Sequence, residues 1–255
     1  MIRTVDSHCH LQSEPLRSQA AQALALARQG GVVDLLIPGI EPAHAADDVA
    51  QAEELDVWVS VGCHPCHPDA WDESLIRRWL AHPRVVAVGE CGMDFFHKPF
   101  DAALQESVFR AQIALALEHD LPLILHNRES DRELVAILRD AGARGGVFHC
   151  FGGDARCLED ALELGFFVSF AGNVTYPKSS FRELVARVPR ERLLVETDAP
   201  WLAPVPERGK PNRPALVVRV LEEVARLRGE DPAELGEAVI GNFAKCFPKA
   251  RRTAA

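Results

Sequence analysis

Eight short runs of apolar, largely β-branched residues recur along the chain and alternate with longer stretches of helical periodicity. Each run is continuously apolar instead of alternating with polar residues, which is typical of strands buried on both faces. The runs lie at 2–6, 32–37, 57–61, 84–89, 122–126, 146–150, 165–170 and 192–198. Successive runs begin roughly 20 to 40 residues apart, the length of a strand–helix unit. This rhythm predicts an α/β fold, and favours a closed (β/α)8 TIM barrel over a doubly wound open sheet.

Amphipathic helical patterns fill the intervals between the runs and follow the last one. They lie at 15–29, 43–54, 69–81, 101–119, 130–140, 154–164, 179–188, 213–228 and 232–240. Asp101 is the expected N-cap of the clearest helix. No linker or low-complexity tract interrupts the pattern, so we expect one domain over 1–255. The proline-rich stretch at 199–214 excludes regular structure and is expected to form a loop over the mouth of the barrel.

Composition narrows the class of protein and of partner. The chain has 255 residues, 47% hydrophobic and 25% charged, as in soluble globular proteins. A net charge of −9 argues against a general polyanion-binding surface, so a nucleic acid would be gripped locally, by metals or a few basic side chains. The seven cysteines and the lack of a signal-peptide pattern lead us to expect a cytoplasmic location, with no membrane association and no obligate protein partner.

Residues of the types that bind metals follow five of the predicted strands. They are His8 and His10 after the first strand, Glu90 at the end of the fourth, His126 at the end of the fifth, His149 near the end of the sixth and Asp198 at the end of the eighth. In a parallel barrel these strand ends meet at one mouth. Residues i and i+2 of an extended segment point the same way, so His8 and His10 can reach one ion.

Four imidazoles and two carboxylates exceed the three protein ligands of a single open catalytic ion. The number of ligands therefore predicts two divalent cations (Mg²⁺, Mn²⁺ or Zn²⁺), with Glu90 as the bridge. Such a pair is suited to phosphodiester hydrolysis, because it activates water and stabilises the attacking and leaving oxygens. Asp198 and Glu90 are the expected catalytic carboxylates, with Asp198 as a proton acceptor.

Two other functions stay open at this point. The same activated water could attack a carbonyl, which would make the protein an ester or amide hydrolase. A scaffold that binds metal without catalysis would instead fill every coordination position with protein ligands.

Six sequence blocks resemble the TatD family of metal-dependent deoxyribonucleases, in the family's order and across nearly the whole chain. They are VDSHCHL (5–11), GCHP (62–65), GECGMDFF (89–96), LILHNR (123–128), HCFGG (149–153) and ETDAPWLAP (196–204). YPKSS (176–180) and GKPNRP (209–214) are similar to the YjjV-type branch of that family.

The resemblance implies an amidohydrolase-like TIM barrel with two metals. By that likeness, one metal is held by His8, His10, Glu90 and Asp198, and the other by Glu90, His126 and His149. It also implies deoxyribonuclease or phosphoesterase activity of the 3′-to-5′ exonuclease type on a nucleic acid or small phosphoester. Some members resemble D-aminoacyl-tRNA deacylases, which keeps ester or amide hydrolysis as the alternative.

Five further residues are expected to contact substrate or its phosphates. They are His64, Arg128, Lys210, Asn212 and Arg213. The planar fork of an arginine matches phosphate oxygens, and loops after the last two strands of barrels often bind phosphate. The chain departs from the family pattern at Pro211, which replaces a basic residue, and Lys210 and Arg213 could substitute for it.

The segment from Cys63 to His67 spells C-x-x-C-H, a pattern also found at haem attachment sites. Haem attachment requires export, so a loop at the barrel mouth is the favoured interpretation, with a zinc clip as a further possibility. For Asp94, a role in ordering its loop is favoured over an approach to the metals through water.

Overall fold

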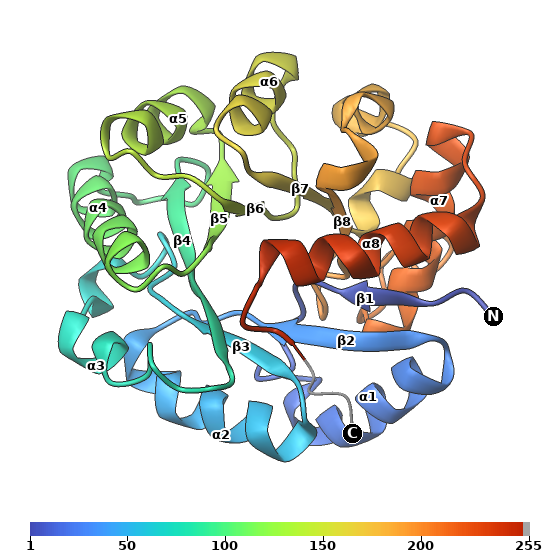
Figure 1. The fold of residues 1–255 in the computed structure, drawn as a ribbon, viewed down its shortest axis with the longest axis horizontal. Helices are drawn as coiled ribbons and strands as arrows, with labels where there is room; N and C mark the ends of the chain where they lie inside the picture. The colour runs from blue at the N-terminus through green and yellow to red at the C-terminus, as the bar shows by residue number, and fades with distance from the viewer. Residues whose placement is uncertain (252–255) are drawn as a thin grey trace.

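The computed structural model describes residues 1–251, which form an eight-stranded parallel barrel with helices outside it (Figure 1). The strands are β1 (Thr4–Asp6), β2 (Val32–Ile37), β3 (Trp58–Val61), β4 (Val85–Asp94), β5 (Leu123–Arg128), β6 (Gly146–Phe148), β7 (Phe167–Phe170) and β8 (Leu193–Val195). They pair in sequence order from β1 to β8, and every pair is parallel. Just after β1, the Ser7 amide donates to the Val195 carbonyl of β8 at 3.2 Å, which joins the first strand to the last.

The TIM-barrel prediction is therefore confirmed, and the doubly wound alternative is wrong. Because sequence neighbours pair throughout, no point exists at which the strand order reverses. The predicted domain of 1–255 ends in residues 252–255, which lie outside the described part of the chain.

Eight α-helices of the described residues lie on the outside of the barrel. They are α1 (Ala20–Gln29), α2 (Ala45–Leu55), α3 (Glu73–Arg77), α4 (Ala102–Glu118), α5 (Asp131–Asp140), α6 (Ala155–Glu163), α7 (Val217–Arg228) and α8 (Pro232–Cys246). Short 3₁₀ segments are η1 (Arg17–Gln19), η2 (Pro42–His44), η3 (Pro68–Ala70), η4 (Gly172–Thr175), η5 (Ser180–Arg187), η6 (Arg190–Arg192) and η7 (Pro214–Leu216). None of these helices is both long and apolar enough to cross a bilayer.

Aspartate caps set where several helices begin. The Asp101 carboxylate accepts the Leu104 amide at 3.0 Å, which confirms the predicted cap of α4. Asp154 and Asp231 cap α6 and α8 in the same way. Each cap satisfies amides that a helix leaves unpaired at its first turn.

Several predicted boundaries are wrong, and three of them show the physical reason. The strand predicted to end at residue 89 continues to Asp94, because this stretch of β4 pairs with β5. The helix predicted over 69–81 begins only at Glu73, because Asp72 accepts the Ser74 amide at 2.9 Å and caps the chain there. The helix predicted over 179–188 is the 3₁₀ segment η5, and the Ser179 hydroxyl donates to the Asn173 carbonyl instead of capping it.

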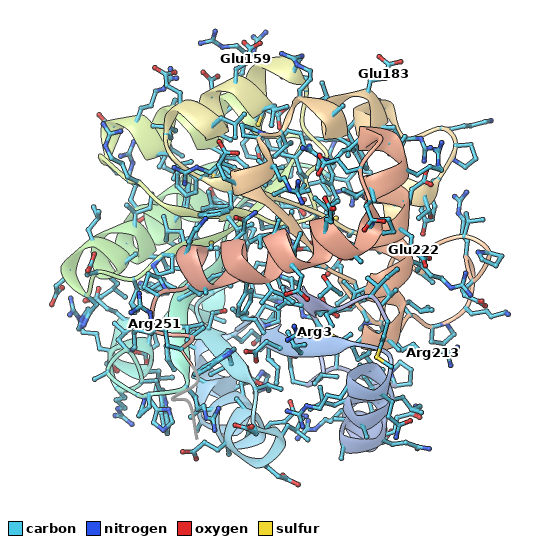
Figure 2. The ribbon with its side chains drawn as sticks, turned by 45° about the vertical axis from the view of Figure 1, so that its right-hand side comes forward. Arg3, Glu159, Glu183, Arg213, Glu222 and Arg251 are labelled. Atoms are coloured by element: carbon cyan, nitrogen blue, oxygen red, sulfur yellow. The ribbon has the colours of Figure 1, made fainter. Side chains whose placement is uncertain are left out.

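Helix α8 closes the chain against the barrel. The buried Asn242 amide donates to the carbonyls of Arg190 and Leu193, and Phe243 and Phe247 are buried beneath the helix. Charged side chains such as Arg3, Glu159 and Glu222 instead point outward from the barrel's exterior (Figure 2). Apolar side chains are thus buried against the barrel, and charged side chains face solvent. The histidines and carboxylates buried at the barrel mouth depart from this pattern.

Candidate metal centre

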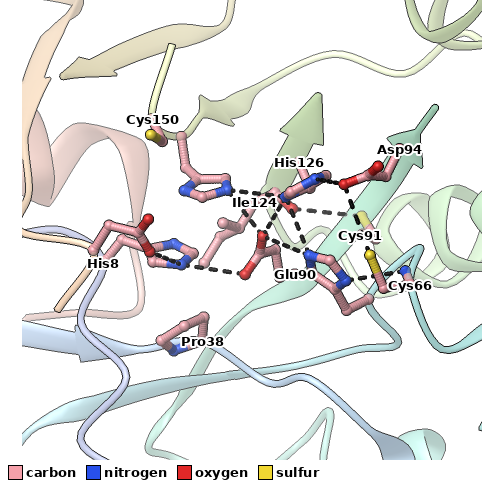
Figure 3. A network of polar contacts seen from close by, with 12 residues as sticks. His8, Pro38, Cys66, Glu90, Cys91, Asp94, Ile124, His126 and Cys150 are labelled. Atoms are coloured by element: carbon pink, nitrogen blue, oxygen red, sulfur yellow. Dashed lines mark hydrogen bonds and ion pairs between the residues drawn. The ribbon is translucent and has the colours of Figure 1, made fainter. Parts of the chain in front are cut away.

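The barrel brings all six residues predicted as metal ligands together at the carboxyl ends of its strands. His8 and His10 follow β1, Glu90 lies in β4, His126 in β5, His149 after β6 and Asp198 after β8. Ligand atoms of these residues form groups in which all atoms lie within 4.8 Å of one another. Figure 3 shows the network around Glu90.

Glu90 lies between two sets of histidines. Its Oε1 is 2.8 Å from His126 Nδ1 and 2.9 Å from His149 Nε2, whereas its Oε2 is 3.2 Å from His8 Nε2. One carboxylate therefore turns one oxygen toward each set, as a bridging ligand does. We call His8, His10 and Asp198 the His8 side, and His64, His126 and His149 the His126 side.

On the His8 side, the Nε2 atoms of His8 and His10 and the Oδ1 atom of Asp198 lie close together. His8 Nε2 lies 3.0 Å from His10 Nε2, and His10 Nε2 lies 3.3 Å from Asp198 Oδ1. The His8 ring also stacks on His149, with centroids 4.0 Å apart and planes 10° apart. These contacts hold both imidazoles with their Nε2 atoms facing a common point.

On the His126 side, carboxylates hold two of the rings from behind. His126 Nε2 lies 2.9 Å from Asp94 Oδ2, and His149 Nδ1 lies 3.2 Å from Glu196 Oε1. Such carboxylate–histidine pairs orient metal ligands and raise their basicity. Sequence reasoning missed Glu196 entirely, although its place two residues before Asp198 was a usable signal. For Asp94 it favoured a loop-ordering role over an approach to the metals.

His64 lies closer to the centre than a substrate contact needs to. Its Nε2 is 3.3 Å from Glu90 Oε1 and 3.1 Å from His126 Nδ1, and these three residues form one of the groups able to hold an ion. Burial lowers the pKa of His64 to about 4, which keeps its nitrogen lone pair available near neutral pH. The geometry makes His64 a candidate ligand in addition to the predicted six.

The donor set fits divalent cations. Glu90 Oε2 is buried, and its contact with His8 Nε2 at 3.2 Å lacks hydrogen-bond geometry, so within residues 1–251 this oxygen has no hydrogen-bond partner, which is rare for a buried carboxylate. Ligands around a tetrahedral ion at about 2.0–2.1 Å lie roughly 3.3 Å apart, close to the spacings seen here. Imidazole with carboxylate suits Zn²⁺ or Mn²⁺ better than Mg²⁺.

The carboxylates of the centre are held in their charged form. Burial alone would raise the pKa of Glu90, but the facing imidazoles of His149 and His64 hold it well below its usual value. Burial would also raise the pKa of Asp198, but the hydrogen bond with His10 outweighs burial and holds this pKa below its usual value. Both side chains can therefore act as anionic ligands or as proton acceptors.

The backbone beside Glu90 leaves no room for a side chain at Gly62, which faces Gly89. A Cβ on Gly62 would lie 2.6 Å from the Gly89 backbone, so β3 and β4 approach each other too closely for any larger residue. Asp198 has a left-handed φ of 53°, and its amide donates to the His8 carbonyl at 3.0 Å. A conformation of this kind persists where surrounding contacts hold it, as they commonly do at functional sites.

The four other expected substrate contacts lie in different surroundings. Arg128 is exposed, with its guanidinium 4.1 Å from the centre of the Phe96 ring. Lys210 is exposed and pairs with Glu207 at 3.1 Å, and Arg213 is exposed on the outside of the molecule (Figure 2).

Asn212 does not have the environment expected of a phosphate contact. It is buried, and its amide donates to the carbonyls of Thr197 and Trp201 at 2.9 and 2.7 Å. Its side-chain oxygen accepts the Arg213 amide at 2.8 Å. Because these bonds engage both ends of the amide, Asn212 orders the 199–214 loop.

The two cysteines of the C-x-x-C-H segment point in different directions. Cys63 is buried, and its thiol donates to the His67 carbonyl at 3.2 Å, whereas Cys66 is exposed and faces Asp94. Within residues 1–251, no group of ligand-type side chains contains both thiols. The geometry therefore supports a loop at the barrel mouth and not a joint clip.

A parallel (β/α)8 barrel with histidines and carboxylates gathered at its mouth is an arrangement suited to metal-dependent hydrolysis. The family model of TatD related DNase matches residues 5–248, so this chain belongs to the TatD family of metal-dependent hydrolases.

Individual relatives agree with this assignment over nearly their whole length. The uncharacterized metal-dependent hydrolase YabD of Bacillus subtilis is 35% identical over 95% of this chain and 98% of its own. The 3′-5′ ssDNA/RNA exonuclease TatD of Erwinia tasmaniensis is 33% identical, with the same coverage. The crystal structure of the TatD homolog YjjV from Escherichia coli superposes with a TM-score of 0.90 at 31% identity, covering 96% of this chain and 98% of that one.

Proposed function

We propose that this protein is a two-metal hydrolase of phosphodiester bonds that shortens single-stranded nucleic acids from their 3′ ends. The observation that carries the proposal is the placement of Glu90, whose two carboxylate oxygens face two separate sets of imidazoles. The relative named as a 3′-5′ ssDNA/RNA exonuclease supports the substrate and the direction.

Each side of the centre contributes different ligands. His8, His10 and Asp198 would hold one cation and His126 and His149 the other, with Glu90 shared between them. Divalent cations bound there lower the pKa of water and neutralise charge on phosphate oxygens.

Asp198 is the proposed proton acceptor. Its side chain is 14% exposed, so solvent reaches it, and its lowered pKa keeps the carboxylate ionised near neutral pH. This access to solvent also argues against a scaffold whose coordination positions are all filled by protein. Arg128, exposed just beyond His126, is the proposed clamp on the substrate phosphate.

The alternative substrate is an ester or amide, as in a D-aminoacyl-tRNA. Many barrels with carbonyl substrates bridge their metals with a carboxylated lysine on the fourth strand, but β4 carries Glu90 and no lysine. This favours the phosphodiester, and turnover of both substrates by one preparation separates the two proposals.

The test is degradation of a short single-stranded DNA labelled at its 5′ end. The wild-type protein, loaded with Mn²⁺ or Zn²⁺, should give a ladder of progressively shorter labelled products, and a chelator should abolish it. Glu90→Gln should lower kcat/KM by roughly 10²–10³-fold, because it removes the charged bridge and the electrostatic stabilisation that depends on it. Glu237→Gln is the matched control and should retain full activity, because Glu237 is exposed on the outer surface, where it pairs with Arg3.

Two results would reject the proposal. One is cleavage that survives both chelation and Glu90→Gln. The other is turnover of a D-aminoacyl-tRNA by a metal-loaded preparation that leaves the DNA intact, which would establish the alternative.

A further inference from the structure

A second cluster of ligand-type side chains lies beside the centre, on the rim of the barrel. It consists of Cys66 from the loop after β3, Asp94 at the end of β4 and His97 from the following loop, and we call it the rim triad. Cys66 Sγ lies 3.7 Å from Asp94 Oδ2 and 3.8 Å from His97 Nδ1. Asp94 Oδ2 and His97 Nδ1 lie 2.8 Å apart. Figure 3 shows Cys66 and Asp94 facing each other next to His126.

The backbone aims the Asp94 carboxylate at the other two side chains. Its Oδ1 accepts the amides of Phe96 and His97 at 2.9 and 2.8 Å, which leaves Oδ2 directed toward Cys66. Asp94 is fully buried, whereas Cys66 and His97 are exposed and line one wall of a surface hollow. The triad thus combines one fixed anchor with two side chains that solvent and ions can reach.

The spacings of the rim triad match a tetrahedral zinc site. With Zn–S of about 2.3 Å and Zn–N and Zn–O of about 2.0 Å, neighbouring ligands lie roughly 3.3–3.6 Å apart. The two distances from Cys66 Sγ are already near that range. The separation of His97 Nδ1 from Asp94 Oδ2 must widen by roughly half an ångström. The His97 side chain is 58% exposed and can move that far without disturbing the core.

We propose that Cys66, Asp94 and His97 form a further divalent-cation site, distinct from the candidate centre and selective for Zn²⁺ over Mg²⁺ or Mn²⁺. Selectivity follows from the donors, because a thiolate with an imidazole suits zinc and not hard, oxygen-seeking cations. Three protein ligands leave a fourth position open to solvent. An ion there would tie together the rim loops after β3 and β4.

The site would also be coupled to the neighbouring centre through Asp94. The same Oδ2 atom that faces Cys66 and His97 lies 2.9 Å from His126 Nε2. A cation on the rim triad would therefore change the hydrogen-bond partner that orients His126 from behind. This coupling rests on the proposed function for its effect on activity, whereas binding at the rim does not.

The test uses Co²⁺ as a spectroscopic substitute for Zn²⁺. The candidate centre offers nitrogen and oxygen ligands, so a near-ultraviolet charge-transfer band from sulfur to Co²⁺ reports a thiolate ligand. The full-length wild-type protein, stripped and then titrated with Co²⁺, should show this band, and Zn²⁺ should displace it. After equilibration with Zn²⁺, metal analysis should find about one equivalent more in the wild type than in Cys66→Ser.

Matched variants make the outcome decisive. Cys66→Ser should lose the band. His97→Ala, at a second exposed position, should weaken Co²⁺ binding to the rim triad, followed by the same band, at least tenfold. Cys63→Ser should keep the band, because Cys63 faces the His67 carbonyl. A band that persists in Cys66→Ser, or equal zinc content in both proteins, would overturn the proposal. Neither measurement requires hydrolysis, so both would still report on metal binding at the rim triad if the proposed function failed.

Discussion

The two sides of the candidate centre hold their imidazoles by different means. On the His126 side, His126 and His149 each have a carboxylate partner, Asp94 and Glu196 respectively. A charged partner fixes the ring orientation, selects the tautomer and makes the metal-facing nitrogen more basic.

The His8 side relies on packing. The Nδ1 atoms of His8 and His10 have no hydrogen-bond partner among residues 1–251. His8 is instead stacked on His149, and His10 meets the Trp201 ring edge-on at 4.8 Å. Packing fixes the plane of a ring but does not raise its basicity. If two cations bind as proposed, we therefore expect the one on the His126 side to bind more tightly and the one on the His8 side to exchange more readily.

Among the changes that test this difference between the sides, the largest effect is expected from removing a carboxylate partner on the His126 side. Glu196→Gln keeps the size of the side chain but removes its charge from behind His149, and should weaken the tighter cation-binding step by about 10–100-fold. Competition with a chelator of known affinity measures that step. Glu191→Gln, an exposed change nearby in the sequence, is the control. If Glu196→Gln weakened only the looser step, the assignment of the two sides would be reversed.

His149 on the His126 side and His8 on the His8 side also differ in how they respond to protons. Burial alone would lower the pKa of His149, but the carboxylates of Glu90 and Glu196 hold it well above its usual 6.5. Burial and the neighbouring His149 lower the pKa of His8. Above pH 6.5 the cation-free protein therefore loses a bound proton from His149 on unfolding, and none from His8.

This difference predicts how stability depends on pH without metal. The stabilisation from protonated His149 is complete below pH 6.5 and is lost as the pH rises through the raised folded pKa. Within that window the contribution of His149 to the free energy of unfolding should fall by about 1.4 kcal/mol per pH unit. Urea unfolding in the presence of a chelator measures the pH dependence, and His149→Gln should make its slope shallower. A slope that is the same in His149→Gln and in the wild type would contradict the difference between these two histidines.

The sequence predicted the barrel because strands buried on both faces leave continuous apolar runs, which local composition reveals directly. It failed where tertiary pairing decides the outcome. The stretch from Glu90 to Asp94 contains glycine and acidic residues, so it resembles a loop, yet pairing with β5 makes it strand. That extension places Asp94 behind His126, which explains why its contact with His126 could not be read from the sequence.

The six predicted ligands could be placed together because each combines a metal-binding side chain with the end of a strand. The surrounding shell was less accessible. Glu196 directly follows β8 and lies two residues before Asp198, so its place at the barrel mouth was predictable but its partner was not. Asn212 was assigned to substrate from its motif, whereas the folded loop uses its amide internally. The motif located Asn212 at the barrel mouth, but the carbonyls of Thr197 and Trp201, which the sequence does not place, determine what its amide contacts.

The smallest expected effect concerns packing on the His8 side. Trp201 is 52% exposed, so Trp201→Ala removes its contact with His10 with little disturbance of the core. An aromatic contact contributes about 1 kcal/mol, which corresponds to roughly a fivefold loss of affinity. That loss should fall on the looser cation-binding step and leave the tighter step unchanged, as chelator competition can resolve. Leu117→Ala, similarly exposed on α4, should alter neither step. An equal loss in both steps would mean that packing and charge hold the two sides alike, and the distinction between them would fail.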